Sequence, residues 1–526
     1  MRRDIALGRR DLSRRGLSRK DLLWLAGLIA LGCLTLIASA FHAHRFTGGE
    51  GGVPLDDAWI HFQFARNLAR GDGFAFNPGQ PTAGSTAPLW TLLLSGVYAL
   101  GGRFPIAGQV LSAICFLVTL LSTYVLGKHL TGHRWAGWLA GGLVAVNGRM
   151  VWAGLSALEI CLFATLSLLA IDSHLTDRGE DHYRLRTGAL FGLAALARPE
   201  GYLLFVAAMI DFTFCILRET RYVFRAASHV LRKVFLPAIL FALIVAPYLI
   251  FSLRTSGHLL PNTFHAKATF NFLPDRDFLS LWARYLVLDN PLLLPFYLLG
   301  VMLLLAHHRA GPVKERASLL SVWSLGLPIS YAFLHAVLYQ HGRYLMPLIP
   351  CHAVIAVTGL LIARSMLRRR GWRWERSEAS LLAIVTLLAI AGTAWRLPTM
   401  ARQYAWNVRN INQMHVALGR WVAENTPPNA TLALNDIGAI TYVSERPVVD
   451  LAGLITPEVI PLLTVSDRTS HLVEFMTWRE VEYAIIFPNW FPGLAAHDAL
   501  EPIHQVALER RTIGGGETMV VYQTLW

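Results

Sequence analysis

Apolar segments long enough to cross a bilayer recur along this chain from Leu22 to Ala394, and they restrict its fold more than any other feature. A helix needs about 20 apolar residues to cross the hydrocarbon core, where every backbone polar group must be hydrogen bonded within the protein. Only 15% of the residues are charged, whereas about a quarter are charged in soluble domains. The sequence therefore predicts an α-helical protein with many membrane spans.

Basic residues gather in short loops between the apolar segments, and their placement predicts the orientation of the chain. Many Lys and Arg residues precede the first segment, Leu22–Phe41, which places the N-terminus in the cytoplasm. The apolar run Pro88–Leu100 is too short to cross, so we expect a juxtamembrane or re-entrant helix there. About eleven spans then place every strongly basic loop inside. Counting Pro88–Leu100 as a span would move the later basic loops outside.

The net charge of +13 follows from these loops, so we expect membrane lipids and no nucleic acid as partners. The same placement of basic loops, together with the number of apolar segments, predicts a multi-pass membrane protein whose N-terminus is cytoplasmic. No internal repeat is visible in the sequence.

Hydropathy falls after about Pro398, which divides the chain into residues 1–397 and 398–526. The first part is the predicted transmembrane domain, and residues 42–104 form its first outer loop. In the second part, helical and strand patterns alternate and predict a soluble α/β domain, extracytoplasmic because the span count is odd. The predicted helix is Arg402–Asn425, and the predicted strands are Thr431–Leu434, Val448–Leu451, Tyr483–Phe487 and Met519–Gln523.

Two adjacent acids, Asp56 and Asp57, lie in the first outer loop, shortly after the first span. Neighbouring carboxylates that are desolvated together raise each other's pKa, which suits a group that accepts a proton. The alternative is structural: one acid caps the helix that begins near Ala58, and the other is solvated.

Further polar side chains fall on the same outer side of the predicted topology. Ionisable groups near the hydrocarbon are costly, which makes them candidates for a functional site. Each also has a structural interpretation, such as contact with lipid headgroups, an internal ion pair or a helix cap. The residues concerned are Arg149, Glu159, Arg198, Glu200, Asn262, His265, Lys267, His341, Arg343 and Tyr344.

Acids facing cations at the outer leaflet suit the transfer of a sugar from a lipid phosphate. An acid would deprotonate the incoming hydroxyl, and cations would stabilise the departing phosphate. The paired acids could also hold Mg²⁺ or Mn²⁺, although no third oxygen ligand is evident. The sequence shows no required cofactor and leaves a need for a divalent metal open. Candidates for the donor phosphate are Arg198, Lys267, Arg343, His265 and His341. Candidates for other substrate contacts are Glu159, Glu200, Asn262, Tyr344 and Arg149.

The ordered set of motifs resembles bacterial GT-C glycosyltransferases, in particular the mycobacterial arabinofuranosyltransferases that use decaprenyl-phosphoryl-arabinose. The motifs are Asp56-Asp57-Ala58-Trp59, Arg198-Pro199-Glu200-Gly201, Leu260-Pro261-Asn262-Thr263-Phe264-His265-Ala266-Lys267, Gly342-Arg343-Tyr344 and Asp436-Ile437-Gly438-Ala439.

The resemblance implies a GT-C fold and a catalytic base from the first-loop acids. It implies that a polyprenyl-phosphate-linked sugar and an envelope glycan or lipid acceptor meet on the extracytoplasmic face of a bacterial inner (plasma) membrane. We expect Asp56 to be the base and Asp57 to orient it or the substrate. Trp59 replaces an expected Tyr, and His265 replaces an often aromatic residue. The sugar therefore stays open, with arabinofuranose as one candidate.

We thus expect an inverting glycosyltransferase. One alternative is a transporter or flippase of a lipid-linked sugar, which would show internal repeats and charges near the membrane midplane. Another is a non-catalytic envelope-assembly protein whose tail domain binds glycan.

Overall fold

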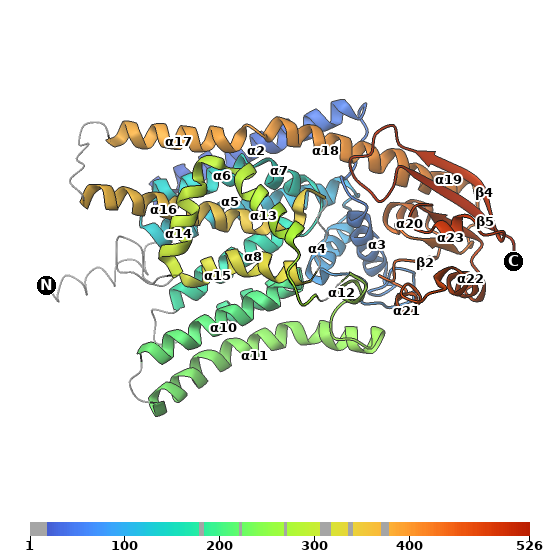
Figure 1. Ribbon diagram of the computed structural model, residues 1–526, viewed down its shortest axis with the longest axis horizontal. Helices are drawn as coiled ribbons and strands as arrows, with labels where there is room; N and C mark the ends of the chain where they lie inside the picture. The colour runs from blue at the N-terminus through green and yellow to red at the C-terminus, as the bar shows by residue number, and fades with distance from the viewer. Residues whose placement is uncertain are drawn as a thin grey trace.

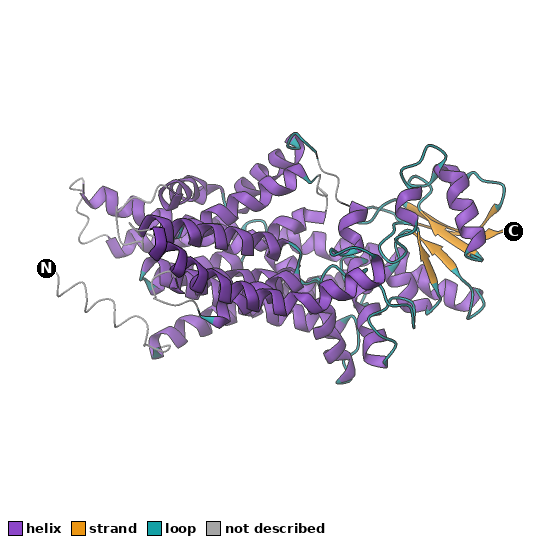
Figure 2. Cartoon of the chain, turned by 90° about the horizontal axis from the view of Figure 1, so that it is seen from below, coloured by secondary structure: helices purple, strands orange, loops and turns teal. Residues whose placement is uncertain are grey.

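The computed structural model describes residues 18–177, 184–219, 223–267, 271–305, 317–334, 340–369 and 378–526. A bundle of long helices forms one part of the molecule, and a smaller domain with a β-sheet lies at the C-terminal end of its long axis (Figure 1). All of the named strands belong to this smaller domain (Figure 2). The helical membrane domain and C-terminal α/β domain expected from the sequence are confirmed.

The bundle consists mostly of apolar helices. They are α2 (Arg19–Phe46), α5 (Ile106–Thr131), α6 (Arg134–Ala145), α7 (Gly148–Leu155), α8 (Ile160–Asp177), α9 (Leu185–Ala197), α10 (Glu200–Glu219), α11 (Val223–Ser256), α14 (Leu294–Leu305), α15 (Ser318–Phe333), α16 (Ile349–Arg369) and α17 (Glu378–Ala394). Short helices lie at the end of the bundle nearest the sheet: α3 (Asp57–Arg70), α4 (Pro88–Ala99), α12 (Asn262–Lys267) and α13 (Arg276–Asp289). The 3₁₀ segments are η1 (Pro291–Leu293) and η2 (Gln340–Leu348).

Within the described ranges, 6 helices are long and apolar enough to cross a membrane, or up to 7 if the bent pair α13 and α14 is one span. Three shorter apolar helices, α4, α9 and α15, add to these. The predicted number of about eleven spans stays a prediction. Helix α4 has only 12 residues, as expected for a segment too short to cross.

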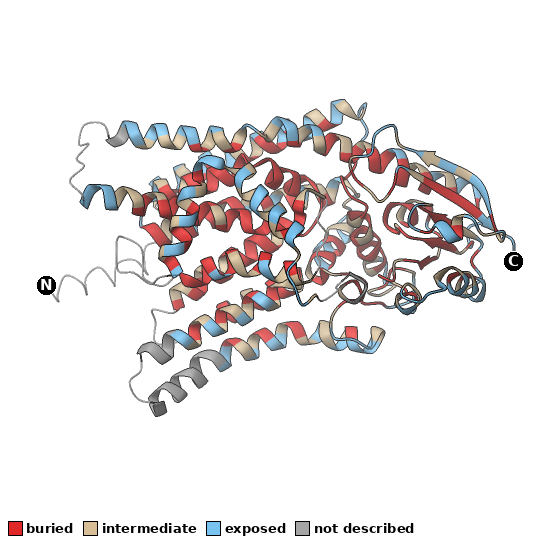
Figure 3. Ribbon diagram, viewed as in Figure 1, coloured by how far each residue is buried: buried red, intermediate tan, exposed pale blue. Residues whose placement is uncertain are grey.

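Many positions on the outside of the bundle are exposed (Figure 3), and many of the exposed side chains are large and apolar. Leu243 on α11 and Leu387 on α17 are examples, with 64% and 69% of their surface exposed. Exposed apolar surface of this extent is unfavourable in water but favourable against lipid. The bundle is therefore that of a multi-pass membrane protein.

The C-terminal domain contains a 5-stranded sheet in the order β2-β1-β3-β5-β4. Its strands are β1 (Leu432–Leu434), β2 (Val448–Asp450), β3 (Tyr483–Ile486), β4 (Leu500–Ala507) and β5 (Thr518–Thr524). Strands β2, β1 and β3 run parallel, whereas β5 and β4 are antiparallel to their neighbours. The sequence did not predict β4, an edge strand whose side chains are mostly exposed.

The two parts join through an almost uninterrupted helical path. Helix α17 is followed directly by α18 (Leu397–Ile411), a π-helical turn (Asn412–Val416) and α19 (Ala417–Asn425). The predicted helix Arg402–Asn425 lies within this path. The short helix α20 (Gly438–Ser444) of the sheet domain packs against α3. Helix α3 is therefore held between the bundle and the C-terminal domain.

Candidate active site

Helix α3 contacts α20 of the C-terminal domain with one face and the helical bundle with another. Trp59, Phe62 and Arg66 recur at helical spacing and contact the ring of Tyr442 on α20. Arg66 also donates to the Tyr442 carbonyl over 2.9 Å. Asp57 and His61 are four residues apart and therefore lie on one face. This second face contacts charged residues of the bundle.

These residues form a compact charged cluster. Arg343 Nη1 lies 2.5 Å from Asp57 Oδ2, and Arg198 contacts Glu159 at 3.0 Å and Glu200 at 2.6 Å. His61 Nε2 lies 3.7 Å from Glu159 Oε2 and connects the two ion-pair groups. We use the name charged cluster for Asp57, His61, Glu159, Arg198, Glu200, Tyr331, Arg343 and Tyr344.

Two tyrosines complete the charged cluster. The guanidinium groups of Arg198 and Arg343 lie 5.2 and 5.1 Å from the centre of the Tyr344 ring, and Arg343 also donates to the Tyr344 hydroxyl over 3.2 Å. The Tyr331 hydroxyl donates to Glu200. Because the arginines share Tyr344 as a neighbour, they face one region of the protein.

Accessibility differs sharply within the charged cluster. The side chains of Arg198 and Arg343 are only 6% and 9% exposed, whereas that of Asp57 is 33% exposed. Arg343 Nε is buried and has no hydrogen-bond partner among the described residues. Burial lowers the pKa of His61, which keeps this imidazole neutral near pH 7. The charged cluster therefore has an accessible acid beside an arginine with an unused donor.

Asp56 points to a different place. Its carboxylate accepts hydrogen bonds from the backbone N–H groups of Gly438 and Ala439, each over 2.7 Å, and so caps α20. It makes no side-chain cap bond to α3, although it occupies the N-cap position there. Desolvation raises the pKa of Asp56 to about 6. Nearby, His415 and Asp436 lie 2.9 Å apart. Asp56 therefore connects α3 to the C-terminal domain.

The position of Asp56 does not fit the role of base that the sequence interpretation favoured for it. The sequence favoured Asp56 as the base and gave Asp57 a supporting role. In the structure only Asp57 contacts the charged cluster, and both oxygens of Asp56 accept bonds from α20. The identity of the base stays a prediction, and the geometry favours Asp57.

Arg149 and His341, also predicted site residues, belong to a separate group. Arg149 donates to the carbonyl oxygens of His341 and Gly342 over 2.9 Å each. It pairs with Asp289 at 2.8 Å. His341 Nε2 lies 2.9 Å from Asn407 Oδ1. The set of residues expected at one site is thus divided between two clusters.

The remaining predicted residues lie near α12. Asn262 Nδ2 donates to the Leu454 carbonyl over 3.2 Å, and the Asn262 N–H donates to the Ala83 carbonyl. The side chains of His265 and Lys267 lie outside the described residues. Within the described part of the chain, no group of three or more His, Cys, Asp or Glu is placed to hold a metal ion.

Sequence reasoning missed two members of the charged cluster. His61 carries a signal, because it is one helical turn after Asp57. Tyr331 lies in the apolar helix α15, and its contact with Glu200 joins residues far apart in the chain.

Comparisons with known proteins bear first on the C-terminal part. Residues 404–522 match a family described as a domain of unknown function, DUF8728. No curated protein sequence matches the chain significantly.

Solved structures resemble nearly the whole chain. A crystal structure of ArnT from Cupriavidus metallidurans bound to undecaprenyl phosphate is similar at a TM-score of 0.57 and 12% identity, over 95% of this chain and 97% of that chain. The oligosaccharyltransferase AglB from Archaeoglobus fulgidus, solved in complex with an inhibitory peptide and a dolichol-phosphate, is similar at a TM-score of 0.57 and 14% identity. The similarity covers 89% of this chain and 70% of that chain.

Arabinofuranosyltransferase AftD from Mycobacteria gives a TM-score of 0.52 at 15% identity, over 97% of this chain but only 42% of that larger chain. ArnT, AglB and AftD are all GT-C glycosyltransferases. Identities this low show a shared fold, and the agreement covers both the helical bundle and the C-terminal end. The chain therefore has the GT-C glycosyltransferase fold predicted from its motifs.

Proposed function

We propose that the protein is an inverting glycosyltransferase that moves a sugar from a polyprenyl-phosphate donor to an acceptor hydroxyl at the charged cluster. The observation that carries this proposal is the contact between Asp57 and Arg343. Asp57 is the most accessible acid of the charged cluster, and the buried Nε of Arg343 has no hydrogen-bond partner among the described residues. Structures of similar fold support a lipid-phosphate donor, since ArnT was solved with undecaprenyl phosphate and AglB with a dolichol-phosphate.

The chemistry needs one base and stabilisation of a leaving phosphate. The acceptor hydroxyl gives its proton to the Asp57 carboxylate while its oxygen forms a bond to the anomeric carbon. The bond from that carbon to the phosphate oxygen breaks, and its electron pair leaves with the polyprenyl phosphate. Attack opposite the leaving group inverts the anomeric centre. Arg343 stabilises the charge that accumulates on the departing phosphate.

Asp57 suits the base better than Asp56 because of what surrounds each acid. Capping of α20 occupies both oxygens of Asp56, whereas the carboxylate of Asp57 is a third exposed. A donor phosphate that took the place of the Asp57 carboxylate beside Arg343 would break this ion pair and turn the carboxylate toward the acceptor. The role of Arg198 is to hold Glu159 and Glu200 in place and to add positive charge near the phosphate.

The donor site requires more than these two arginines. Three carboxylates contact them, so the described part of the charged cluster has no excess of positive charge. We propose that Lys267 and His265 on α12 provide further donors. The remaining site residues, Glu159, Glu200 and Tyr344, would contact the sugar or the acceptor. We place the reaction on the extracytoplasmic face of a bacterial inner membrane, with an envelope glycan or lipid as acceptor and arabinofuranose as one candidate sugar.

Sealed proteoliposomes provide the test. Purified protein is given polyprenyl phosphate that carries a radiolabelled sugar, together with an envelope extract as acceptor. A glycosyltransferase releases free polyprenyl phosphate and labels the acceptor. Movement of the intact donor across the bilayer without cleavage would instead identify a transporter. Repeating the assay with EDTA tests the divalent metal that the sequence left open.

A further inference from the structure

A cationic cavity lies behind the segment that carries Arg343. It has a volume of about 230 Å³. Its lining combines basic and amide side chains with apolar ones: Arg149, Arg284, His341, Arg396, Gln403 and Met400. These residues come from α7, α13, η2 and the junction of α17 with α18. The cavity is therefore bounded by four separate elements at the outer end of the bundle.

The charges in this cationic cavity are not balanced. Arg149 pairs with Asp289 at 2.8 Å. Arg284 and Arg396 form no ion pair among the described residues. Two arginines beside one cavity repel each other unless an anion neutralises them. This excess of positive charge distinguishes the cavity from the charged cluster, where carboxylates contact both arginines.

The lining of the cationic cavity also contains Leu281 and Leu288, and exposed apolar side chains lie close to its arginines in the sequence. Trp395, next to Arg396, is 61% exposed, and Val287 near Arg284 is 44% exposed. Tryptophan at such a position is typical of the interface between membrane and water. Guanidinium groups beside apolar membrane helices are suited to bind the phosphate of a lipid headgroup. The surroundings therefore suit a ligand that has a phosphate group and an adjoining apolar part.

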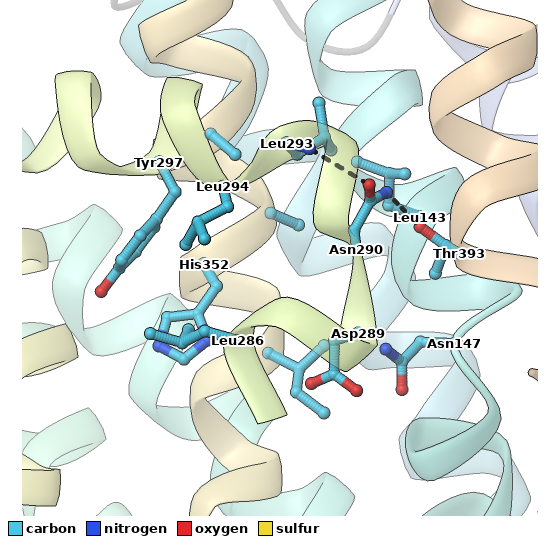
Figure 4. Close-up of a pocket in the computed structure, with 13 residues that line it drawn as sticks. Leu143, Asn147, Leu286, Asp289, Asn290, Leu293, Leu294, Tyr297, His352 and Thr393 are labelled. Carbon is cyan, nitrogen blue, oxygen red and sulfur yellow. Dashed lines mark hydrogen bonds between the residues drawn. The ribbon is translucent and has the colours of Figure 1, made fainter. Parts of the chain in front are cut away.

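A second, smaller cavity in the bundle lacks the arginines that line the cationic cavity. It has a volume of about 60 Å³ and is lined by Asp289, His352, Tyr297 and several leucines (Figure 4). It contains no arginine. Asp289 thus lines one cavity and pairs with Arg149, which lines the other.

We propose that the cationic cavity binds a phosphate group, in the first place that of an anionic lipid headgroup, through Arg284 and Arg396. Guanidinium groups bind phosphate through paired, charge-assisted hydrogen bonds. Arg149 forms the inner wall and already holds the carbonyls of His341 and Gly342. The bound group would therefore lie beside His341, two residues before Arg343 in the sequence, but outside the charged cluster. This proposal does not depend on glycosyl transfer.

Native mass spectrometry of the full chain tests it. Protein is released from nanodiscs that contain phosphatidylcholine with a minor fraction of phosphatidylglycerol. We expect retention of phosphatidylglycerol over phosphatidylcholine, and binding about tenfold or more weaker in Arg284→Gln/Arg396→Gln. Arg402→Gln is the matched control, because Arg402 is an exposed arginine on α18 outside the cavity. Equal retention in the double variant and the control would overturn the proposal.

A second measurement separates the possible sources of the phosphate. Inorganic phosphate is added to the detergent-solubilised protein, and thermal unfolding is followed. Stabilisation of the wild type, but not of the double variant, would identify a soluble phosphate as a ligand of the same cavity. If the double variant does not fold, Arg284→Gln alone serves, since Arg284 is exposed. If neither phosphatidylglycerol retention nor stabilisation by phosphate differs between the cavity variant and the Arg402→Gln control, the proposed site is refuted.

Discussion

Replacing Asp56 by Ala should weaken the contact between the C-terminal domain and α3. The side chain accepts two backbone N–H groups of α20 at 2.7 Å each. Loss of an N-cap costs about 0.5–2 kcal/mol, and a buried N–H without a partner costs about 1–3 kcal/mol. Part of this loss is offset because the desolvated charge disappears, as the raised pKa of Asp56 indicates. We therefore expect a net loss of about 1–3 kcal/mol at neutral pH.

Hydrogen–deuterium exchange measures this loss at the place where it occurs. Exchange of the α20 and α3 amides should become about 5- to 100-fold faster in Asp56→Ala. Asp467→Ala is the matched control, because Asp467 caps α22 (Arg468–Trp478) within the C-terminal domain and accepts from the Ser470 N–H. Its effect should stay within α22. Unchanged exchange of α20 and α3 in Asp56→Ala would refute the role assigned to Asp56.

Further predictions concern the same junction and the segment before Arg343. A Cβ at Gly438 would lie 2.7 Å from Asp56 Oδ2, so Gly438→Ala should loosen α20 in the exchange assay, whereas Gly96→Ala, in open space on α4, should not. The folded-state pKa values of Asp56 (about 6, from 3.8) and His415 are both raised, so the docked state binds more protons. Its stability should therefore fall as pH rises from about 4, through the pKa of Asp56, to above about 6.5, where His415 loses its proton. Exchange at α20, corrected for the intrinsic rate, should accelerate over that range, and less in His415→Gln; a flat or opposite trend would contradict the assignment. Arg149→Lys removes a forked contact to two carbonyls and should slow sugar transfer by about tenfold through kcat rather than KM; an unchanged kcat would exclude this positioning role.

The architecture was predictable because it depends on local patterns. Hydropathy and charge placement locate the membrane helices and the soluble domain without knowledge of contacts. Strand β4 escaped detection because Leu500–Ala507 is a mostly exposed edge strand with an internal Pro502. The core strands β1, β2 and β3 were visible as apolar runs.

The site was predictable only in part, because topology assigns residues to a side of the membrane but not to a cavity. Arg198 and Arg343 do meet, through Tyr344. Arg149 was assigned to the same site, yet it contacts the back of the segment that carries Arg343. The contact of Asp56 with Gly438 spans 382 positions, and no local pattern indicates it.

One comparison tests most directly whether Asp57 is the base. Asp56→Asn and Asp57→Asn are assayed side by side for sugar transfer from a polyprenyl-phosphate donor, with exchange at α20 as the check on folding. We expect Asp57→Asn to lose about 10²–10⁴-fold in kcat, as when a general base is removed. Asp56→Asn should retain transfer to within about tenfold, since its role is structural. Full activity of Asp57→Asn, with transfer abolished in a correctly folded Asp56→Asn, would contradict the proposed mechanism.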